Sequence, residues 1–198
     1  MDRILIIAAT RAEAAHVPRG VQVVLTGLGK TAAAVATTRA LMSADRQGLT
    51  VVNIGTAGAL REGLSGLHEI GSVLNHDMNA AAVRALGFDP QELLAIGPSE
   101  VVLASGDLFV TDALVRDALA ERAHLVDMEG YAVAYACQHL GVPLRMVKHV
   151  SDNADDSALD WPAVVDRSAR VLGEWLADFV HVDEISSRDR PDDSRFRP

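Results

Sequence analysis

The sequence predicts a single α/β domain with a central mixed, largely parallel β-sheet that is flanked by helices. Short runs of apolar and β-branched residues alternate along the chain with Ala-rich stretches of helical spacing. Several of the short runs are apolar on both faces, which is typical of strands that helices cover on both sides. With 198 residues, the chain is long enough to bury one full core.

Seven short runs have the composition of strands. We expect these strands at Arg3–Ala9, Val21–Thr26, Thr50–Ile54, Ile70–Asn75, Glu100–Ala104, His124–Met128 and Leu144–Val150. Ala-rich stretches between the strands predict helices at Lys30–Ala44, Asp112–Arg122 and Glu129–Leu140. Thr111 is the expected N-cap of the second of these helices, because its hydroxyl can accept a bond from a first-turn amide.

The last helix is the clearest one in the sequence. Asp160 is placed to cap it, and Pro162 suits its first turn, where a backbone N–H would have no helical partner. The side chains that recur at helical spacing, nearly all of them apolar, are Val164, Ser168, Val171, Leu172, Trp175 and Phe179. Residues 183–198 are almost wholly polar, so we expect a catalytic domain over residues 1–182 and a mobile tail over 183–198.

Composition excludes several classes of protein. Hydrophobic residues make up 49% of the chain and charged residues 23%, and no apolar run is long enough to cross a bilayer. The net charge of −9 argues against a nucleic-acid partner, because no basic surface would neutralise phosphates. A single cysteine, Cys137, excludes an internal disulfide, and the N-terminus lacks the features of a secretory signal. These features predict a cytoplasmic protein.

Two loops that follow predicted strands carry candidate functional residues, since ligands of α/β sheets bind at the carboxyl ends of strands. Glu13 lies one turn beyond the first strand, where a carboxylate can activate a water, although an ordinary first-turn glutamate is the simpler interpretation. Thr56 stands between Gly55 and Gly58, and glycines allow a ligand to approach the backbone closely.

The polar residues after the sixth predicted strand form a third candidate. Asp127 and Glu129 bracket Met128, and the two carboxylates would share one side of the sheet if the strand continued that far. A carboxylate at the start of a helix can accept two hydrogen bonds, as recognition of a vicinal diol requires. An N-cap with an acidic first turn is the alternative interpretation.

The mostly polar segment that follows Val147 has three interpretations. A catalytic triad of His149, Ser151 and Asp152 is excluded, because neighbours in one strand cannot form the relay and no Gly-x-Ser-x-Gly elbow exists. A metal site at Asp152, Asp155 and Asp156 does not fit the spacing of a calcium loop. A buried Asp152 that acts as a general acid is the remaining interpretation.

The Gly-Lys-Thr at positions 29–31 invites comparison with a phosphate-binding loop. That motif requires a further glycine five residues before Gly29, and Val24 occupies this position. An NTPase function is therefore rejected.

Six collinear segments together resemble the purine nucleoside phosphorylase superfamily. The segments are Ile6–Glu13, Thr26–Lys30, Val51–Gly58, Ala104–Val110, Val126–Glu129 and Val150–Asp152. The resemblance is closest to the hydrolytic branch, the methylthioadenosine/S-adenosylhomocysteine nucleosidases. It implies a nucleoside phosphorylase-like fold, a homodimer and a hydrolase that needs neither a metal nor a cofactor. The implied reaction cleaves the glycosidic bond of an adenine nucleoside, to give adenine and a ribose derivative.

The resemblance also implies a role for each matching residue. Asp152, preceded by Ser151, would protonate N7 of the leaving adenine, because adenine departs readily only when that nitrogen is protonated. Glu13 would activate the water on the opposite side of C1′, as in the general logic of inverting glycosidases. The remaining matches bind substrate: Met128 and Glu129 at the ribose, Phe109 and Val110 at the base, and Thr56, Ala57 and Gly58 at the sugar and water.

The sequence departs from that family at several places, and two rival functions remain open. Too few residues separate Glu13 from Thr26 for the usual extra hairpin, the segment 76–88 is short, and Thr56 replaces the commoner serine. The first rival is a phosphorylase, for which Arg11 with Thr56 is the candidate phosphate site. The second rival is a nucleoside-binding module without turnover.

Overall fold

A computed structural model describes residues 3–188 of the chain, with side chains as far as residue 181. The strands are β1 (Arg3–Ala8), β2 (Gln22–Leu25), β3 (Leu49–Ala59), β4 (Leu67–Glu69), β5 (Ser72–Asn75), β6 (Leu93–Ala95), β7 (Val102–Ser105), β8 (Leu125–Asp127) and β9 (Leu144–Asp152). The helices are α1 (Lys30–Ser43), α2 (Ala80–Ala85), α3 (Ala113–Ala120), α4 (Gly130–Leu140) and α5 (Trp161–Arg188), and a 3-10 turn, η1 (Asp156–Asp160), precedes α5.

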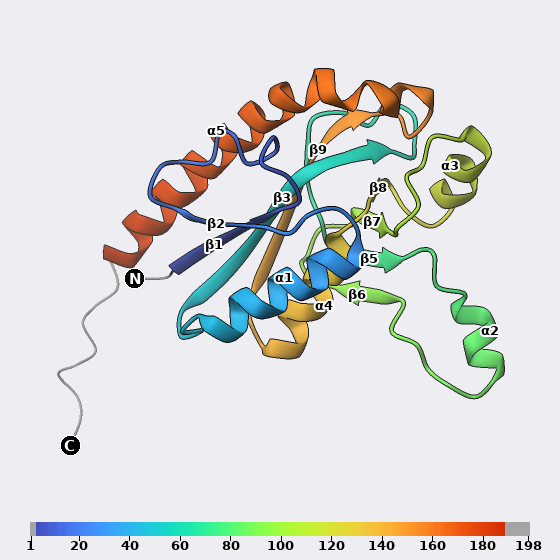
Figure 1. Cartoon of the computed structure of the whole chain (residues 1–198), viewed down its shortest axis with the longest axis horizontal. Helices are drawn as coiled ribbons and strands as arrows, with labels where there is room; N and C mark the ends of the chain where they lie inside the picture. Colours follow the sequence, from blue (N-terminus) through green and yellow to red (C-terminus); the bar gives the residue numbers. More distant parts are fainter. Residues whose placement is uncertain (1–2, 189–198) are drawn as a thin grey trace.

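Within the described residues, the strands form one mixed sheet in the order β2-β1-β3-β8-β7-β5-β6, and β9 pairs with β3 and β4. Most pairings are parallel; β8 against β3, β4 against β9 and β6 against β5 are antiparallel. Helices α1 and α4 cover one face of the sheet and α5 crosses the other face (Figure 1). The single α/β domain with a mixed, largely parallel sheet is therefore confirmed.

The core is divided between the two faces of the sheet by the alternation of side chains along each strand. In β1, Leu5 and Ile7 pack beneath α1 and α4, whereas Ile6 packs beneath α5 with Leu172 and Leu176. All five side chains are almost completely buried. This two-sided burial explains why β1 is apolar without interruption from Ile4 to Ala8.

Strand β3 is longer than predicted and is the strand on which the site is built. It continues through Gly55-Thr56-Ala57-Gly58 to Ala59, because β9 pairs with it along that whole stretch. On its other side, β3 pairs with β1 as far as Asn53 and with β8 from Gly58 onward. The edge of β3 between these two pairings faces neither strand, and this gap opens the sheet to a ligand.

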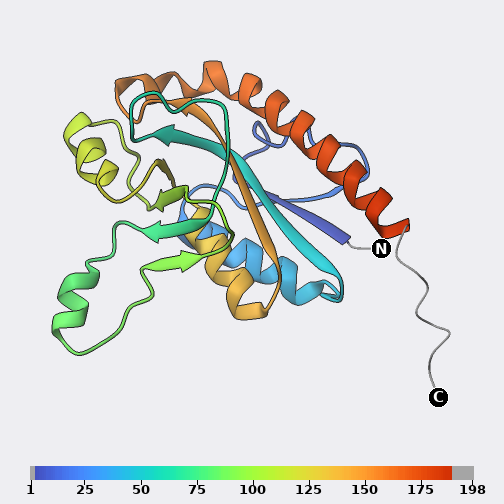
Figure 2. The same cartoon turned by 180° about the vertical axis from the view of Figure 1, so that it is seen from behind.

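Several other expectations differ from the structure. Thr111 is not the N-cap of α3: Asp112 takes that place, and its carboxylate accepts hydrogen bonds from the amides of Leu114 and Val115. The short elements β4, β6 and α2 were not predicted, and α2, with the segments that join it to β5 and β6, projects from the edge of the sheet (Figure 2). No strand lies between Glu13 and β2, in agreement with the expected lack of a hairpin.

Helix α5 begins directly after Asp160 and carries Pro162 in its first turn, as predicted. The helix continues to Arg188, so residues 183–188 of the predicted tail have helical backbone. The remainder of that predicted tail, residues 189–198, lies outside the described residues. Among the residues described, no helix is both long and apolar enough to cross a membrane.

Candidate active site

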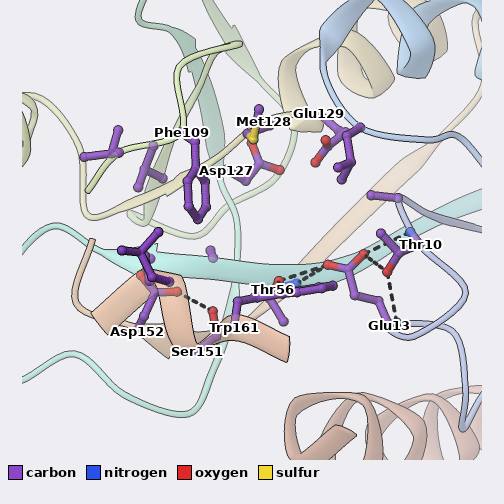
Figure 3. Close-up of a pocket in the computed structure, with 18 of the residues that line it drawn as sticks. Thr10, Glu13, Thr56, Phe109, Asp127, Met128, Glu129, Ser151, Asp152 and Trp161 are labelled. Atoms are coloured by element: carbon purple, nitrogen blue, oxygen red, sulfur yellow. Dashed lines mark hydrogen bonds between the residues drawn. The ribbon is translucent and has the colours of Figure 1, made fainter. Parts of the chain in front are cut away.

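A cavity of about 460 Å³ lies where β1 and β8 part along β3, a volume in the usual range for small-molecule sites. Every site residue predicted from the sequence lines this cavity: Glu13, Thr56, Ala57, Gly58, Phe109, Val110, Met128, Glu129, Ser151 and Asp152. The lining also includes residues that were not predicted, among them Thr10, Leu28, Leu159 and Trp161. Figure 3 shows Glu13 and Asp152 at opposite ends of the cavity, with Thr56 between them.

The Glu13 carboxylate is buried and accepts hydrogen bonds from four donors. Oε1 accepts from the backbone amide of Thr56 at 2.9 Å and from its hydroxyl at 3.0 Å. Oε2 accepts from the amide of Thr10 at 3.0 Å and from its hydroxyl at 2.9 Å. The amide of Thr56 can reach Glu13 because it lies on the part of β3 that faces the gap. These donors fix the carboxylate in one orientation.

Thr10 and Glu13 have the spacing of a capping box, Thr-x-x-Glu, and they make its reciprocal bonds. The Thr10 hydroxyl accepts from the Glu13 amide at 3.2 Å while the Glu13 carboxylate accepts from the Thr10 amide. This motif was present in the sequence, so the spacing alone was a signal that could have identified Thr10.

Two glycines of β3 make room for the carboxylates. A Cβ on Gly55 would lie 3.0 Å from Oε1 of Glu13, and a Cβ on Gly58 would lie 2.9 Å from Oδ1 of Asp152. Both distances are shorter than ordinary contacts, so a side chain at either position would displace a carboxylate. The glycines that resemble a turn in the sequence are therefore required for close approach within an extended strand.

Asp152 is the last residue of β9. The pairing of β9 with β3 shifts by one residue between Ala57 and Gly58, which is a β-bulge at Ser151. Neighbours in a regular strand point to opposite faces, whereas the bulge lets Ser151 and Asp152 both line the cavity. The Ser151 hydroxyl donates to Oδ2 of Asp152 at 2.6 Å and the Ala154 amide donates to Oδ1 at 2.9 Å.

Glu129, immediately before α4, is buried and its Oε1 accepts a hydrogen bond from the Gly29 amide at 2.7 Å. Burial, and next the negative charge of Asp127, raise the pKa of Glu129 to about 7. The Gly29 amide and the ammonium of Lys148 oppose this rise. A carboxyl with a pKa near neutrality changes its charge in the range where cells operate.

A buried ion pair lies beneath the cavity. Nζ of Lys148 is 2.8 Å from Oδ2 of Asp127, and both side chains are almost completely buried. Burial disfavours the ammonium, but the adjacent Asp127 carboxylate together with the charges of Glu129 and Glu13 outweighs this and raises the pKa of Lys148. Asp127 also accepts from the Gly130 amide at 3.0 Å, so it holds the start of α4 next to Glu129. The sequence carries no distinct signal for this pair, because Lys148 is one of several polar residues in β9, which also contains Arg145 and His149.

Trp161 is the site residue that the sequence signalled least. Its indole Nε1 donates to the Thr56 hydroxyl at 2.8 Å, and the two residues are 105 positions apart in the chain. Nothing local to Trp161 indicates this contact, because it depends on the placement of α5 over β3.

The cavity is acidic. Four carboxylates line it, those of Glu13, Asp127, Glu129 and Asp152, and none of the described lining residues is Arg, Lys or His. Arg11 is exposed and does not line the cavity, so the predicted phosphate site of Arg11 with Thr56 is not formed. An anionic co-substrate would meet repulsion at this surface.

The α/β fold and a cavity built at strand ends around opposed carboxylates are features of the nucleoside phosphorylase class. Sequence similarity to known proteins agrees with this class. The family model of the phosphorylase superfamily matches residues 16–181. The chain belongs to this superfamily.

Two relatives with named activities are each 30% identical to this chain over the part that aligns. The chain is 30% identical to an aminodeoxyfutalosine nucleosidase of Helicobacter pylori over 178 residues, which cover 77% of this chain and 76% of that protein. It is also 30% identical to a 5′-methylthioadenosine/S-adenosylhomocysteine nucleosidase of Shewanella oneidensis, with 74% and 73% covered.

Solved structures of nucleosidases have the same fold as this chain. A mutant nucleosidase of Helicobacter pylori with 5′-methylthioadenosine in its active site superimposes with a TM-score of 0.78 at 25% identity, covering 91% of this chain and 99% of that one. A nucleosidase of Streptococcus pneumoniae in complex with 8-aminoadenine gives a TM-score of 0.71 at 26% identity, covering 88% and 98%. The expected nucleoside phosphorylase-like fold is thereby confirmed.

Proposed function

We propose that this chain is a nucleosidase that hydrolyses the N-glycosidic bond of an adenine nucleoside. The observation that carries the proposal is the opposition of Glu13 and Asp152 across one cavity, with Glu129 on its wall. Cleavage of the bond places negative charge on the departing base and positive charge on the ribose. An acid on one side and a base with its water on the other side are the groups that this chemistry requires.

In the proposed mechanism, the C1′–N9 bond breaks and its electron pair passes into the adenine. Asp152 delivers its proton to N7, so adenine leaves as a neutral base. A water attacks C1′ from the opposite side, and Glu13 accepts the proton that this water loses. The products are adenine and a ribose derivative.

We assign supporting roles to the other predicted site residues, all of which line the cavity. The Glu129 carboxylate accepts bonds from the ribose hydroxyls, and Met128 packs on the sugar. Phe109 stacks on the base, Ser151 holds Asp152, and the backbone of Val110 reads the base edge. The segment 56–58 lines the sugar and the water.

The candidate substrates come from the family resemblance and from the names of the relatives, and the acidic lining bears on the choice of nucleophile. The panel of candidates consists of methylthioadenosine, S-adenosylhomocysteine, 5′-deoxyadenosine and aminodeoxyfutalosine, of which three occur in the names of nucleosidases similar to this chain. The acidic cavity favours water over phosphate as the nucleophile. Hydrolysis is therefore the function that the site supports best, ahead of phosphorolysis.

We further propose that the protein acts in the cytoplasm as a homodimer. The free thiol of Cys137 is buried and suits a reducing compartment. Exposed apolar side chains occur on α1 and α4, which share one face of the sheet (Figure 1), and in the segment from α2 to β6: Val35, Met42, Leu86, Phe88, Leu93 and Tyr135. An interface between two copies of the chain would bury such side chains.

The experiment that tests the function is a nucleoside panel incubated with purified protein, with and without phosphate, and read by chromatography of the released base. We expect adenine to appear at the same rate in both conditions, together with a free ribose derivative. Release that strictly requires phosphate would establish phosphorolysis instead. Tight nucleoside binding without release across the panel would establish a binding module.

A further inference from the structure

The indole of Trp161 reaches the floor of the cavity from the first turn of α5. Its Nε1 donates to Oγ1 of Thr56 at 2.8 Å, and the ring lines the cavity beside Thr56 and Glu13 (Figure 3). Thr56 in turn donates to Oε1 of Glu13 at 3.0 Å. The three side chains thus form one hydrogen-bonded chain that ends on a carboxylate.

The chemistry of the three groups fixes the direction of this chain. An indole N–H can only donate, whereas a threonine hydroxyl has one proton and two lone pairs. When Trp161 donates to one lone pair of Thr56, the hydroxyl proton remains available for another acceptor. The ionised Glu13 carboxylate, at 3.0 Å, is that acceptor. Trp161 therefore favours the orientation of the Thr56 hydroxyl in which its proton points at Oε1 of Glu13.

We propose that Trp161 is a positioning residue that orients Glu13 for attack by water, acting through the hydroxyl of Thr56. The inference rests on the proposed role of Glu13 as the base. If the hydroxyl turned away, Oε1 would keep only the Thr56 amide, and the carboxylate would lose one of its four donors. Because small misplacements of a catalytic group reduce rate strongly, this donor affects turnover more than binding.

The backbone around Trp161 is rigid enough for such a role. η1 is held by the Asp155 carboxylate, which accepts from the Ser157 amide at 2.9 Å, and Ala158 is buried. On its far side, α5 is anchored in the core by Leu172 and Leu176. A helix start that is fixed at both ends holds its side chain more accurately than a free loop does.

A double-mutant cycle tests the proposal. In Trp161→Phe the ring persists but the N–H is lost, so we expect kcat to fall about five- to tenfold while KM stays within about twofold, the size of one hydrogen bond. Thr56→Val removes the hydroxyl but keeps the backbone amide that donates to Glu13, so activity remains measurable. In the Thr56→Val background, Trp161→Phe should cause no further loss of kcat.

The controls separate hydrogen bonding from packing and from misfolding. Trp175→Phe, which changes the indole stacked on Phe179 away from the cavity, should leave kcat unchanged. In that background Trp161 is the sole tryptophan, and Thr56→Val should shift its fluorescence emission, because the hydrogen bond of the indole is lost. This spectroscopic readout needs no turnover.

The outcomes are distinct. Loss of kcat in the Trp161→Phe variant only when Thr56 retains its hydroxyl supports the proposal. An unchanged kcat in Trp161→Phe, or an equal loss in both Thr56 backgrounds, overturns it. An unchanged emission in the Thr56→Val variant also overturns it. Failure of the wild-type protein to release adenine would instead contradict the proposed function itself.

Discussion

Three buried ionisable groups lie in or beneath the wall of the cavity, and their charges are interdependent. Lys148 and Asp127 form an ion pair, while Glu129 lies close enough to both for each to affect its pKa. A buried carboxyl next to a second carboxylate is disfavoured as an anion, and the neighbouring ammonium relieves only part of this cost. Glu129 therefore titrates near neutrality, in the range in which it would bind ribose hydroxyls.

The raised pKa of Glu129 predicts a pH dependence of stability. Below about pH 4.5 the group is protonated in both the folded and the unfolded chain, and its contribution to stability is fully present. Between that pH and about 7 the folded chain retains a proton that the unfolded chain has lost, so the free energy of unfolding falls as pH rises. Above about 7 the contribution is gone.

Glu129→Gln has no such titration. Relative to wild type, its free energy of unfolding should therefore rise with pH across this window, by on the order of 1–3 kcal/mol. Urea unfolding at a series of pH values measures the difference. Glu62→Gln, at an exposed position, is the matched control and should give a flat difference. A flat difference for Glu129→Gln as well would show that the pKa is not raised.

Single residues could be identified from the sequence where their role depends on a local motif. Glu13 and Glu129 follow strands and Asp152 ends one, and the resemblance of the collinear segments to a known family predicted that all three lie at one site. Trp161 could not be identified in this way, because its partner Thr56 is distant in the chain and only the packing of α5 joins them.

At the scale of elements, helix α3 illustrates how an N-cap contributes to the stability of a short helix. The helix has eight residues and none of them is fully buried, although Val115, Leu119 and Ala120 pack partly buried against the core. The Asp112 carboxylate accepts from two first-turn amides, at 2.7 and 3.3 Å. We expect the cap to be a main local support of this helix.

Asp112→Ala should lower stability by about 1 kcal/mol and increase hydrogen exchange of the α3 amides, since two first-turn donors lose their acceptor. Thr111→Ala is the matched control at the neighbouring position and should change neither quantity. Exchange measured by mass spectrometry or NMR resolves the helix from the rest of the chain. Equal effects of the two substitutions would contradict the assignment of the cap.

The predicted elements agree with the structure where a local sequence pattern defines them. They differ where pairing with a strand distant in the sequence decides the conformation. β1 and α4 were found nearly at their observed bounds, because apolar runs and helical spacing are local properties. β3 was expected to end at Ile54, since Gly-Thr-Ala-Gly has the composition of a turn. Pairing with β9 keeps this segment extended, and no local pattern encodes that pairing.

At the scale of the whole molecule, α1 carries apolar side chains that the single chain leaves exposed. Val35 and Met42, seven positions apart on α1, are 55% and 65% exposed. Residues at that spacing lie on one face of a helix. The proposed homodimer would bury them.

Met42→Glu should therefore shift the protein from a dimer toward a monomer, because a charge at the centre of an apolar interface loses its hydration without a partner. Light scattering coupled to size-exclusion chromatography measures the mass. Leu114→Glu, at an exposed apolar position of α3, is the control and should leave the mass unchanged. A wild-type protein that is monomeric at micromolar concentration would contradict the proposal.

The most direct measurement of the catalytic account is adenine release by Asp152→Asn, compared with Asp156→Asn, which alters an exposed carboxylate four residues further on. The amide keeps the shape of the side chain but has no acidic proton for N7. We expect release to fall at least about 100-fold in Asp152→Asn, the size of a general-acid contribution, with nucleoside binding retained and Asp156→Asn near wild type. Release by Asp152→Asn within a few-fold of wild type would contradict the account.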